Sequence, residues 1–349
     1  MPVECWSGGH PGLSSVGLVD VHSLALRRSH PQGAGRTAHG WVSLSDARRM
    51  LPPSPFTRAE ALDLGVTHRQ WRQLSADRLV REVTPGLFVD SSIPDTLDLR
   101  FAIVKRAIDP DAVVARRSAA WLQGVDVLDH RGFPTTPRIE TVTRRRGDRS
   151  RTGLVTPHVA DDLLPSDVTE VEGIRVTTPL RTVCDLARFT PRTDALVALD
   201  AYLHSGLVDK KRFTRELVRW KKRRGVRRAW AVAEMADGRS ESGGETRMRL
   251  RVLDMGLPRP VLQIPVPDLF GRNRFWLDMG WPQWMLGLEY DGEEFHPEER
   301  RAHDEARRRW IEGRGWTLRA YRREDIFTVS RHFENEVGEL VRQAAYGTH

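Results

Sequence analysis

The chain has 349 residues, enough for two or three domains that each bury a core. Its net charge of +8 favours a polyanionic partner, most simply nucleic acid, although an arginine-rich composition alone would also raise the charge. The two cysteines, Cys5 and Cys184, exclude a disulfide framework and a thiolate zinc cluster. No apolar run approaches the roughly 20 residues that span a bilayer, and the start lacks a secretory signal. We therefore expect a cytoplasmic protein with no membrane partner.

Residues 1–40 are rich in Gly, Ser, His and Pro and show no sustained periodicity, so we expect a disordered tail. Met50 lies just before the first strong pattern. Residues 1–40 are therefore also compatible with sequence upstream of the true start.

Residues 41–90 contain a helix, a glycine turn, a second helix and a hairpin. The first helix is expected over residues 58–64, opened by a capping box of Thr57 and Glu60. The second helix follows the turn at Gly65, and two short strands, LVREV and LFVD, come after it. This order predicts a winged helix-turn-helix domain.

In a winged helix the second helix presents its N-terminal part to the major groove of DNA. Arg and Gln side chains there can make bidentate base contacts, and Arg side chains in the wing can bind phosphates. An alternative is a winged helix used only for protein contacts. The DNA-binding candidates are Thr67, His68, Arg69, Gln70 and Arg72 in the helix and Arg78 and Arg81 in the wing.

The text of residues 41–90 carries the motif A-x-x-x-G-V-T, followed by a wing that ends in P-G-L-F. It resembles the N-terminal domain of AbiEi-type antitoxins, the regulator half of type IV toxin–antitoxin pairs. The resemblance implies DNA, such as an operator, and a toxin protein as partners. A homo-oligomer is compatible with it.

Residues 91–230 are expected to form a mixed α+β middle region with a basic helical linker. IETVT and LVTPHVA predict strands, and IRVTTPLRTVCDLAR predicts a strand followed by a helix that Thr178 caps. Cys184 on that helix is expected to be a buried core thiol. This block resembles the continuation of antitoxin-like proteins. The positive run over residues 221–228 fits a DNA backbone contact and a solvated face about equally.

The stretch RFWLDMGWPQWMLGLEYDGEEFH, residues 274–296, alternates apolar and other side chains and predicts a β-hairpin. If residues 281 and 284 pair across the turn, Glu289 becomes the diagonal neighbour of Asp278 on one face, with Cβ atoms roughly 7 Å apart. Asp291 follows Glu289 by one alternation and extends that face.

A fourth carboxylate, Glu245, continues the apolar stripe of the preceding helix and should face the sheet. Carboxylates so close repel one another unless a cation or proton lies between them. An all-oxygen cluster suits Mg²⁺ or Mn²⁺ rather than zinc. We therefore predict that Asp278, Glu289 and Glu245 hold a metal ion.

The order helix-Glu, strand-Asp, Glu-x-Asp and His resembles the PD-(D/E)XK nuclease superfamily, and within it the DUF559-type, very-short-patch-repair-like branch. The resemblance covers about residues 242–327. It implies a restriction-endonuclease-like α/β/α domain over residues 240–349 and metal-dependent hydrolysis of phosphodiesters. Asp291 stands where the superfamily lysine is expected. In such a site it would bind a water molecule or a second metal ion. The branch also lacks the lysine and uses a nearby His, so His296 is the candidate base. Arg308 on the following basic helix would stabilise the phosphorane.

The expected fold class is thus α/β multidomain, with a winged helix, a mixed middle region and a nuclease-like end. One function is a DNA-binding protein with a metal-dependent endonuclease-like domain. The alternative is a non-catalytic transcriptional regulator or antitoxin that carries an inactive nuclease fold, which the missing lysine favours. A third possibility is a nucleic-acid binder that acts only within a larger complex, and the residues do not distinguish it from this alternative.

Overall fold

The computed structural model describes residues 43–127, 137–145, 153–292, 298–328 and 330–346. The predicted tail over residues 1–40 and the candidate base His296 lie outside the described residues. No helix in the described ranges is long and apolar enough to cross a membrane.

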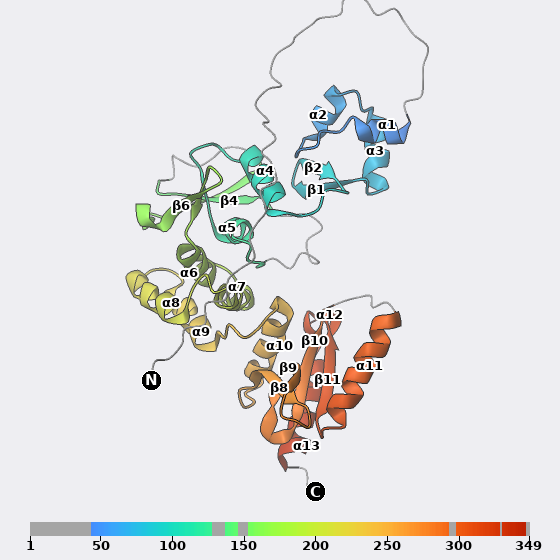
Figure 1. Cartoon of the computed structure of the whole chain (residues 1–349). Coiled ribbons are helices and arrows are strands. Elements are labelled where there is room, and N and C mark those ends of the chain that lie inside the picture. Colours follow the sequence, from blue (N-terminus) through green and yellow to red (C-terminus); the bar gives the residue numbers. More distant parts are fainter. Residues whose placement is uncertain (1–42, 128–136, 146–152, 293–297, 329, 347–349) are drawn as a thin grey trace, which may run out of the picture. The chain divides into compact units, whose positions relative to one another are not determined.

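The first described segment has three helices followed by an antiparallel hairpin (Figure 1). The sequence predicted the second and third helices and the hairpin, but not the first helix. Thr57 and Thr67 both form the capping boxes that open its second and third helices. A small core of Phe56, Trp71 and Leu74 joins these helices to the hairpin. The elements are α1 (Leu44–Arg49), α2 (Arg58–Asp63), α3 (His68–Ala76), β1 (Val80–Thr84) and β2 (Leu87–Asp90).

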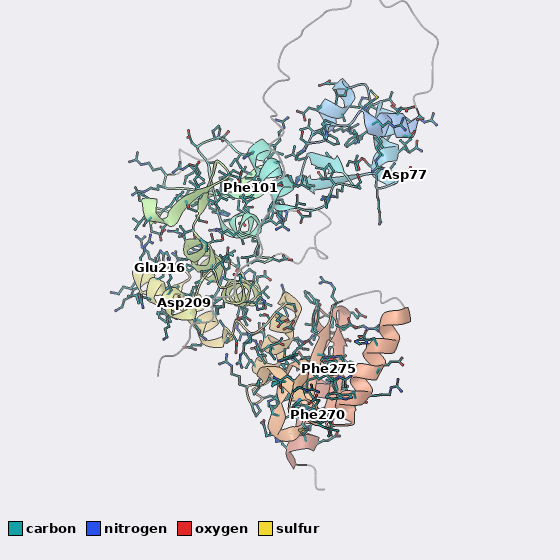
Figure 2. All side chains as sticks on the ribbon, in the orientation of Figure 1. Asp77, Phe101, Asp209, Glu216, Phe270 and Phe275 are labelled. Carbon is teal, nitrogen blue, oxygen red and sulfur yellow. The ribbon has the colours of Figure 1, made fainter. Side chains whose placement is uncertain are left out.

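The middle region begins with a mixed five-stranded sheet in the order β5-β4-β3-β7-β6. Phe101 of α4 (Figure 2) belongs to the core cluster on this sheet, together with Ile139 and Val176. The elements are α4 (Leu97–Ala107), β3 (Val113–Val114), α5 (Arg116–Leu122), β4 (Ile139–Thr143), β5 (Val155–Val159), β6 (Val168–Val171) and β7 (Ile174–Thr177).

Four helices follow the sheet and share a second apolar cluster. Cys184 lies in it and is fully buried, and burial raises the pKa of its thiol, so the predicted core thiol is confirmed. Leu250 of α10 belongs to the same cluster and joins the next part of the chain to it. The helices are α6 (Pro179–Phe189), α7 (Arg192–His204), α8 (Lys210–Leu217) and α9 (Val226–Met235).

The last part of the chain builds a four-stranded sheet in the order β11-β10-β9-β8. Strands β10 and β11 are parallel, and α11 forms the crossover between them. One core cluster joins the sheet to α10 and α13, and another joins it to α11. The elements are α10 (Gly243–Asp254), β8 (Val261–Pro267), β9 (Asn273–Trp281), β10 (Leu286–Asp291), α11 (Glu298–Glu312), β11 (Thr317–Arg322), α12 (Arg323–Ile326) and α13 (His332–Tyr346).

The predicted pairing across the β9–β10 turn is wrong. Trp281 pairs with Leu286, and the register continues to Met279 opposite Leu288. The turn is two residues longer than expected because residues 282–284 form a 3₁₀ turn, which Met285 closes with a left-handed φ of 49°. Continuing this register would place Glu289 opposite Asp278 rather than diagonal to it.

The alternation along β9 is also interrupted at Asp278. Leu277 and Met279 were predicted to share a face, but they belong to different core clusters. Across the sheet, Gln263 of β8 has a left-handed φ of 50° and is skipped in the β8–β9 ladder. At the same point of β9, the carboxylate of Asp278 accepts a hydrogen bond from the backbone N–H of Tyr290 on β10, at 2.7 Å. The central carboxylate therefore lies at an irregular point of the sheet.

Candidate functional sites

The N-terminal turn of α3 places the predicted DNA-binding residues in two different situations. Arg69 and Arg72 are exposed on the helix, and His68 is exposed with its Nδ1 3.0 Å from an Nη atom of Arg58. The Gln70 side chain instead accepts hydrogen bonds from the N–H and Oγ1 of Thr67, each at 2.8 Å. Thr67 and Gln70 thus complete the helix cap, which leaves the arginines as the better candidates for contacts with DNA.

The β1–β2 hairpin, predicted as a wing, packs onto the middle region. Leu87 and Val89 belong to the core cluster of the five-stranded sheet, and Thr84 donates a hydrogen bond to the Pro137 carbonyl at 3.3 Å. Arg81 donates to the Ile93 carbonyl at 2.8 Å. A hairpin held in this way offers less to a DNA backbone than a free wing would.

Arg78 precedes the hairpin, at the turn from α3 into β1. It is exposed and has a left-handed φ of 54°, which costs energy for a residue with a Cβ. Of the two predicted wing arginines, Arg78 is the exposed one and Arg81 is half-buried. Arg58 on α2 was not predicted. Its contact with His68 puts it beside α3. Its position as the first residue of the capped helix α2 is the sequence feature that could have identified it.

The predicted carboxylates come from a helix and two adjacent strands. Glu245 lies in the first turn of α10, is 8% exposed and accepts the Glu241 backbone N–H at 2.9 Å. The prediction that this side chain faces the core is confirmed. Asp278 is on β9, and Glu289 and Asp291 are on β10. Asp291 lies opposite Arg322 in the parallel β10–β11 pairing.

Electrostatic repulsion couples these side chains. Burial and, after it, the charges of Glu245 and Glu289 together raise the pKa of Asp278 to about 7. The pKa of Glu245 is also raised, mainly by burial. The fold therefore brings Glu245, Asp278 and Glu289 close enough for their charges to interact.

Glu289 has a cation of its own. Arg307 of α11 donates to its two carboxylate oxygens at 2.9 and 2.5 Å and to the Trp276 carbonyl at 2.9 Å. The predicted Arg308 instead donates to Glu312 at 3.1 Å and to the Leu318 carbonyl at 3.1 Å. Sequence reasoning missed Arg307, although its position four residues before the buried Ile311 places it on the sheet side of the helix.

A hard divalent cation such as Mg²⁺ needs several oxygen ligands at one place. Across the described ranges, no group of three or more His, Cys, Asp and Glu side chains is arranged to hold a metal ion. Asp278 and Glu245 supply carboxylate oxygens of the right kind, but Arg307 takes both oxygens of Glu289. This arrangement does not form a ready three-carboxylate site, so the magnesium or manganese ion stays a prediction.

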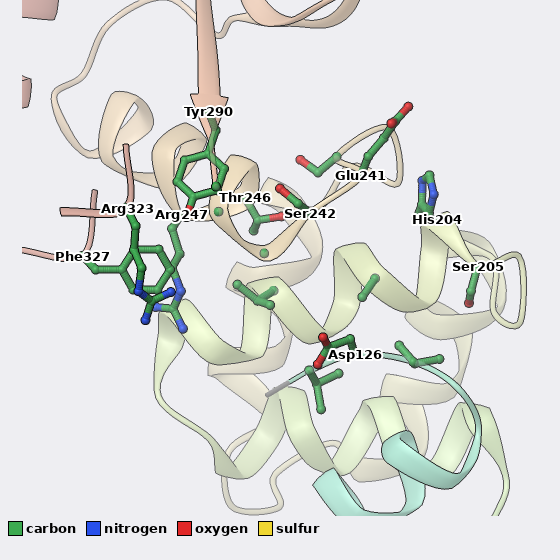
Figure 3. A pocket seen from close by; sticks show the side chains of 18 of the residues that line it. Asp126, His204, Ser205, Glu241, Ser242, Thr246, Arg247, Tyr290, Arg323 and Phe327 are labelled. Carbon is green, nitrogen blue, oxygen red and sulfur yellow. The ribbon is translucent and has the colours of Figure 1, made fainter. Parts of the chain in front are cut away.

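A cavity of about 560 Å³ opens at the N-terminus of α10, and none of these four carboxylates is among its lining residues. Figure 3 shows Tyr290 and Arg247 on one side of it and His204 on another. Gly244 is needed here because a Cβ at this position would lie 1.9 Å from a ring carbon of Tyr290. The close approach explains the second glycine of the Gly-Gly pair that follows the Ser242 cap.

The middle region matches a known protein family. The family model of the AbiEi antitoxin C-terminal domain matches residues 112–235, which run from the strand β3 to the helix α9. Residues 112–235 therefore carry an AbiEi antitoxin C-terminal domain. The similarity to antitoxins was predicted mainly for residues 41–90, with the middle block as its continuation, and the match falls on the middle block.

Two curated relatives are both named as uncharacterized proteins, from Mycobacterium tuberculosis strains CDC 1551 and H37Rv. Each is 35% identical over 150 residues, which is 42% of this chain and 55% of the relative. The chain thus spans about half the length of the curated relatives it matches.

Part of the basic run in the AbiEi domain is used internally. Arg223 pairs with Asp161 at 3.1 Å, and Arg228 donates to the Thr190 carbonyl at 2.7 Å. On α6, the buried Arg181 is paired with Asp185 at 2.8 Å and Asp167 at 2.9 Å. Several arginines of this domain therefore make internal contacts, so part of its positive charge has a role that needs no nucleic-acid partner.

Proposed function

We propose that this protein is a non-catalytic, DNA-binding regulator of the antitoxin type. The observation that carries the proposal is the AbiEi antitoxin C-terminal domain at residues 112–235. The preceding order of α2, a turn, α3 and a hairpin supports it, because that order is typical of winged helix-turn-helix domains. DNA, such as an operator, and a toxin protein are the partners that such a regulator would bind.

In this proposal α3 enters the major groove of DNA. Arg69 and Arg72 are exposed within its first five residues, where a recognition helix contacts base edges and phosphates. Arg78 extends the same positive surface at the end of the helix. The capping box of Thr67 and Gln70 fixes the start of the helix and so keeps the two arginines in place.

The experiment measures binding of the full chain to duplex DNA from its own promoter region as a function of salt concentration. Replacing Arg69 and Arg72 together by Ala removes two positive charges. It should weaken binding and lower the slope of log affinity against log salt by about 2. Arg342→Ala on α13, whose side chain is also well exposed, is the matched control. An unchanged slope in the α3 variant would rule out this DNA surface.

A second candidate is a metal-dependent endonuclease site at the C-terminal sheet. The observation that favours it is the raised pKa of Asp278, because the charges of Glu245 and Glu289 contribute to it. Repulsion of this kind is what a bound cation would relieve. The test is plasmid cleavage in Mg²⁺ or Mn²⁺ by the wild type and by Asp278→Asn. Cleavage that persists unchanged in the variant would exclude this site.

A further inference from the structure

The loop between β8 and β9 presents two large apolar side chains to solvent. Leu269 is 85% exposed and Phe270 is 81% exposed, and both exceed the other exposed large hydrophobic residues in the described part of the chain. Figure 2 labels Phe270 at this loop, in the same domain as Phe275. Leaving such a pair in water forgoes hydrophobic stabilisation, so an exposed apolar tip of this size is typical of an interaction site.

The loop holds these side chains in a fixed position. One carboxylate oxygen of Asp268 accepts the backbone N–H groups of Phe270 at 2.8 Å and Arg272 at 3.0 Å. The backbone N–H of Asp268 donates to the Arg272 carbonyl at 2.8 Å, which closes the turn. Gly271 supplies the positive φ of 78° that the turn requires. The apolar pair is therefore already ordered, which lowers the entropic cost of inserting it into a partner.

The surface beside the tip is positive and aromatic. The guanidinium of Arg274 lies 5.1 Å from the centroid of the Trp310 ring, and that of Arg314 lies 4.6 Å from the same ring. Arg272 pairs with Asp268, and Arg314 donates to the Pro267 carbonyl at 3.4 Å and lies near enough for its charge to act on Asp268 as well. Arg274 forms no ion pair with the residues that the structure describes. Cations held on aromatic faces next to an exposed Phe and Leu favour a partner with both negative charge and flat apolar surfaces.

We propose that this loop is a DNA-contacting wedge, in which Leu269 and Phe270 insert between neighbouring base pairs of a duplex. Arg274 and Arg314 would then neutralise the adjacent phosphates. Apolar side chains of this kind unstack base steps in DNA, and the bend that results brings more protein surface onto the backbone. The wedge belongs to the C-terminal sheet, so it is a contact additional to the α3 surface.

Charge argues against a second copy of the chain as the occupant. Two copies that met through this tip would bring their Arg274 and Arg314 side chains together, and like charges facing each other across an interface are unfavourable. A DNA backbone instead supplies a negative charge beside each base step.

The test uses the full chain and a duplex with alternating TA steps, which unstack easily, in which 2-aminopurine replaces one adenine. Wild-type protein should raise the 2-aminopurine fluorescence because unstacking relieves its quenching. The Leu269→Ser/Phe270→Ser variant should lose that rise and bind roughly tenfold more weakly or worse. Val261→Ser, at the other end of β8 and also exposed, is the matched control and should behave as the wild type.

The outcomes separate this inference from the proposed α3 surface. The same measurement is repeated with Arg69 and Arg72 replaced by Ala. If the α3 variant loses affinity while the double Ser variant binds and fluoresces as the wild type does, the wedge is overturned and the α3 surface stands. A dimer in sedimentation that the double Ser change dissociates would also overturn the wedge, in favour of self-association.

Discussion

Arg307 of α11 donates hydrogen bonds to both carboxylate oxygens of Glu289 on β10, at 2.9 and 2.5 Å. The paired charges satisfy Glu289, whereas Asp278 beside it keeps a raised pKa. A bidentate pair of this kind is among the stronger ionic contacts in proteins. One arginine therefore decides how many carboxylates at this sheet remain available to a cation.

We predict that Arg307→Ala makes the site a better cation ligand. Removing the guanidinium frees Glu289 and removes a charge that lowers the pKa of Asp278. In the absence of metal that pKa should rise above about 7, and added Mn²⁺ should raise the melting temperature more in the variant than in the wild type. Thermal unfolding as a function of pH measures the change in pKa, thermal unfolding with and without Mn²⁺ measures the second effect, and Arg308→Ala is the control. Equal Mn²⁺ shifts in all three proteins would contradict the prediction.

A second prediction concerns the pH dependence of stability. The folded pKa of Asp278, about 7, lies above its ordinary value of 3.8. Stability from the protonated carboxyl is therefore fully present below pH 3.8 and is lost as the pH rises through about 7. Asp278→Asn keeps an acceptor for the Tyr290 N–H but carries no charge. It should be more stable than the wild type at pH 8 by about 2–4 kcal/mol.

At pH 5 the same comparison should give a smaller difference, because Asp278 is mostly protonated in the folded wild type. Urea unfolding at both pH values measures it, and Asp63→Asn on the surface of α2 is the control. A difference between Asp278→Asn and the wild type that is the same at pH 5 and pH 8 would show that the carboxyl does not titrate in this range.

Features with local causes could be predicted from the sequence. A capping box lies within four residues, so Thr57 and Glu60 are recognisable without the fold, and the structure forms that box. Glu245 was placed on the core side of its helix by spacing alone and is buried. Cys184 was placed among apolar neighbours in the same way and is also buried.

Features that depend on unusual backbone conformations or on tertiary packing could not be predicted from the sequence. Met285 and Gln263 adopt left-handed φ without being glycine, so no sequence signal marked the longer turn or the interruption of the β8–β9 ladder. Arg307 and Arg308 are neighbours with the same chemistry, and only the packing of α11 decides which one meets Glu289. The packing of the predicted wing onto the middle region depends on long-range contacts of the same kind.

A third prediction separates base contact from helix capping at Gln70. Its side chain accepts hydrogen bonds from the N–H and Oγ1 of Thr67, which stabilises the start of α3. Gln70→Ala should lower the free energy of unfolding by about 0.5–1 kcal/mol and weaken DNA binding less than Arg69→Ala does. Urea unfolding and fluorescence anisotropy measure the two effects, with the exposed Gln73→Ala as control. A large loss of affinity without loss of stability would mean that Gln70 contacts DNA directly.

A fourth prediction uses two ion pairs that join the same helices, α7 and α10. Asp200 and Arg249 pair with side chains 1% exposed each, whereas Arg192 and Asp254 pair with side chains 46% and 51% exposed. Asp200 also accepts the Thr246 hydroxyl at 2.9 Å. Arg249→Met leaves the carboxylate buried without its cation and should cost about 3–5 kcal/mol. Arg192→Met breaks the exposed pair and should cost under about 1 kcal/mol.

Urea unfolding of both variants at pH 8 and pH 5 tests this difference. Burial already raises the pKa of Asp200, and loss of Arg249 raises it further, so protonation at pH 5 should restore part of the stability of Arg249→Met. Arg192→Met should not recover in this way, because its partner Asp254 stays in contact with water. Replacing Asp200 by Leu together with Arg249→Met removes both buried charges and should bring the stability back toward the wild type. If both single variants lost the same free energy of unfolding at both pH values, burial would not explain the expected larger contribution of the Asp200–Arg249 pair.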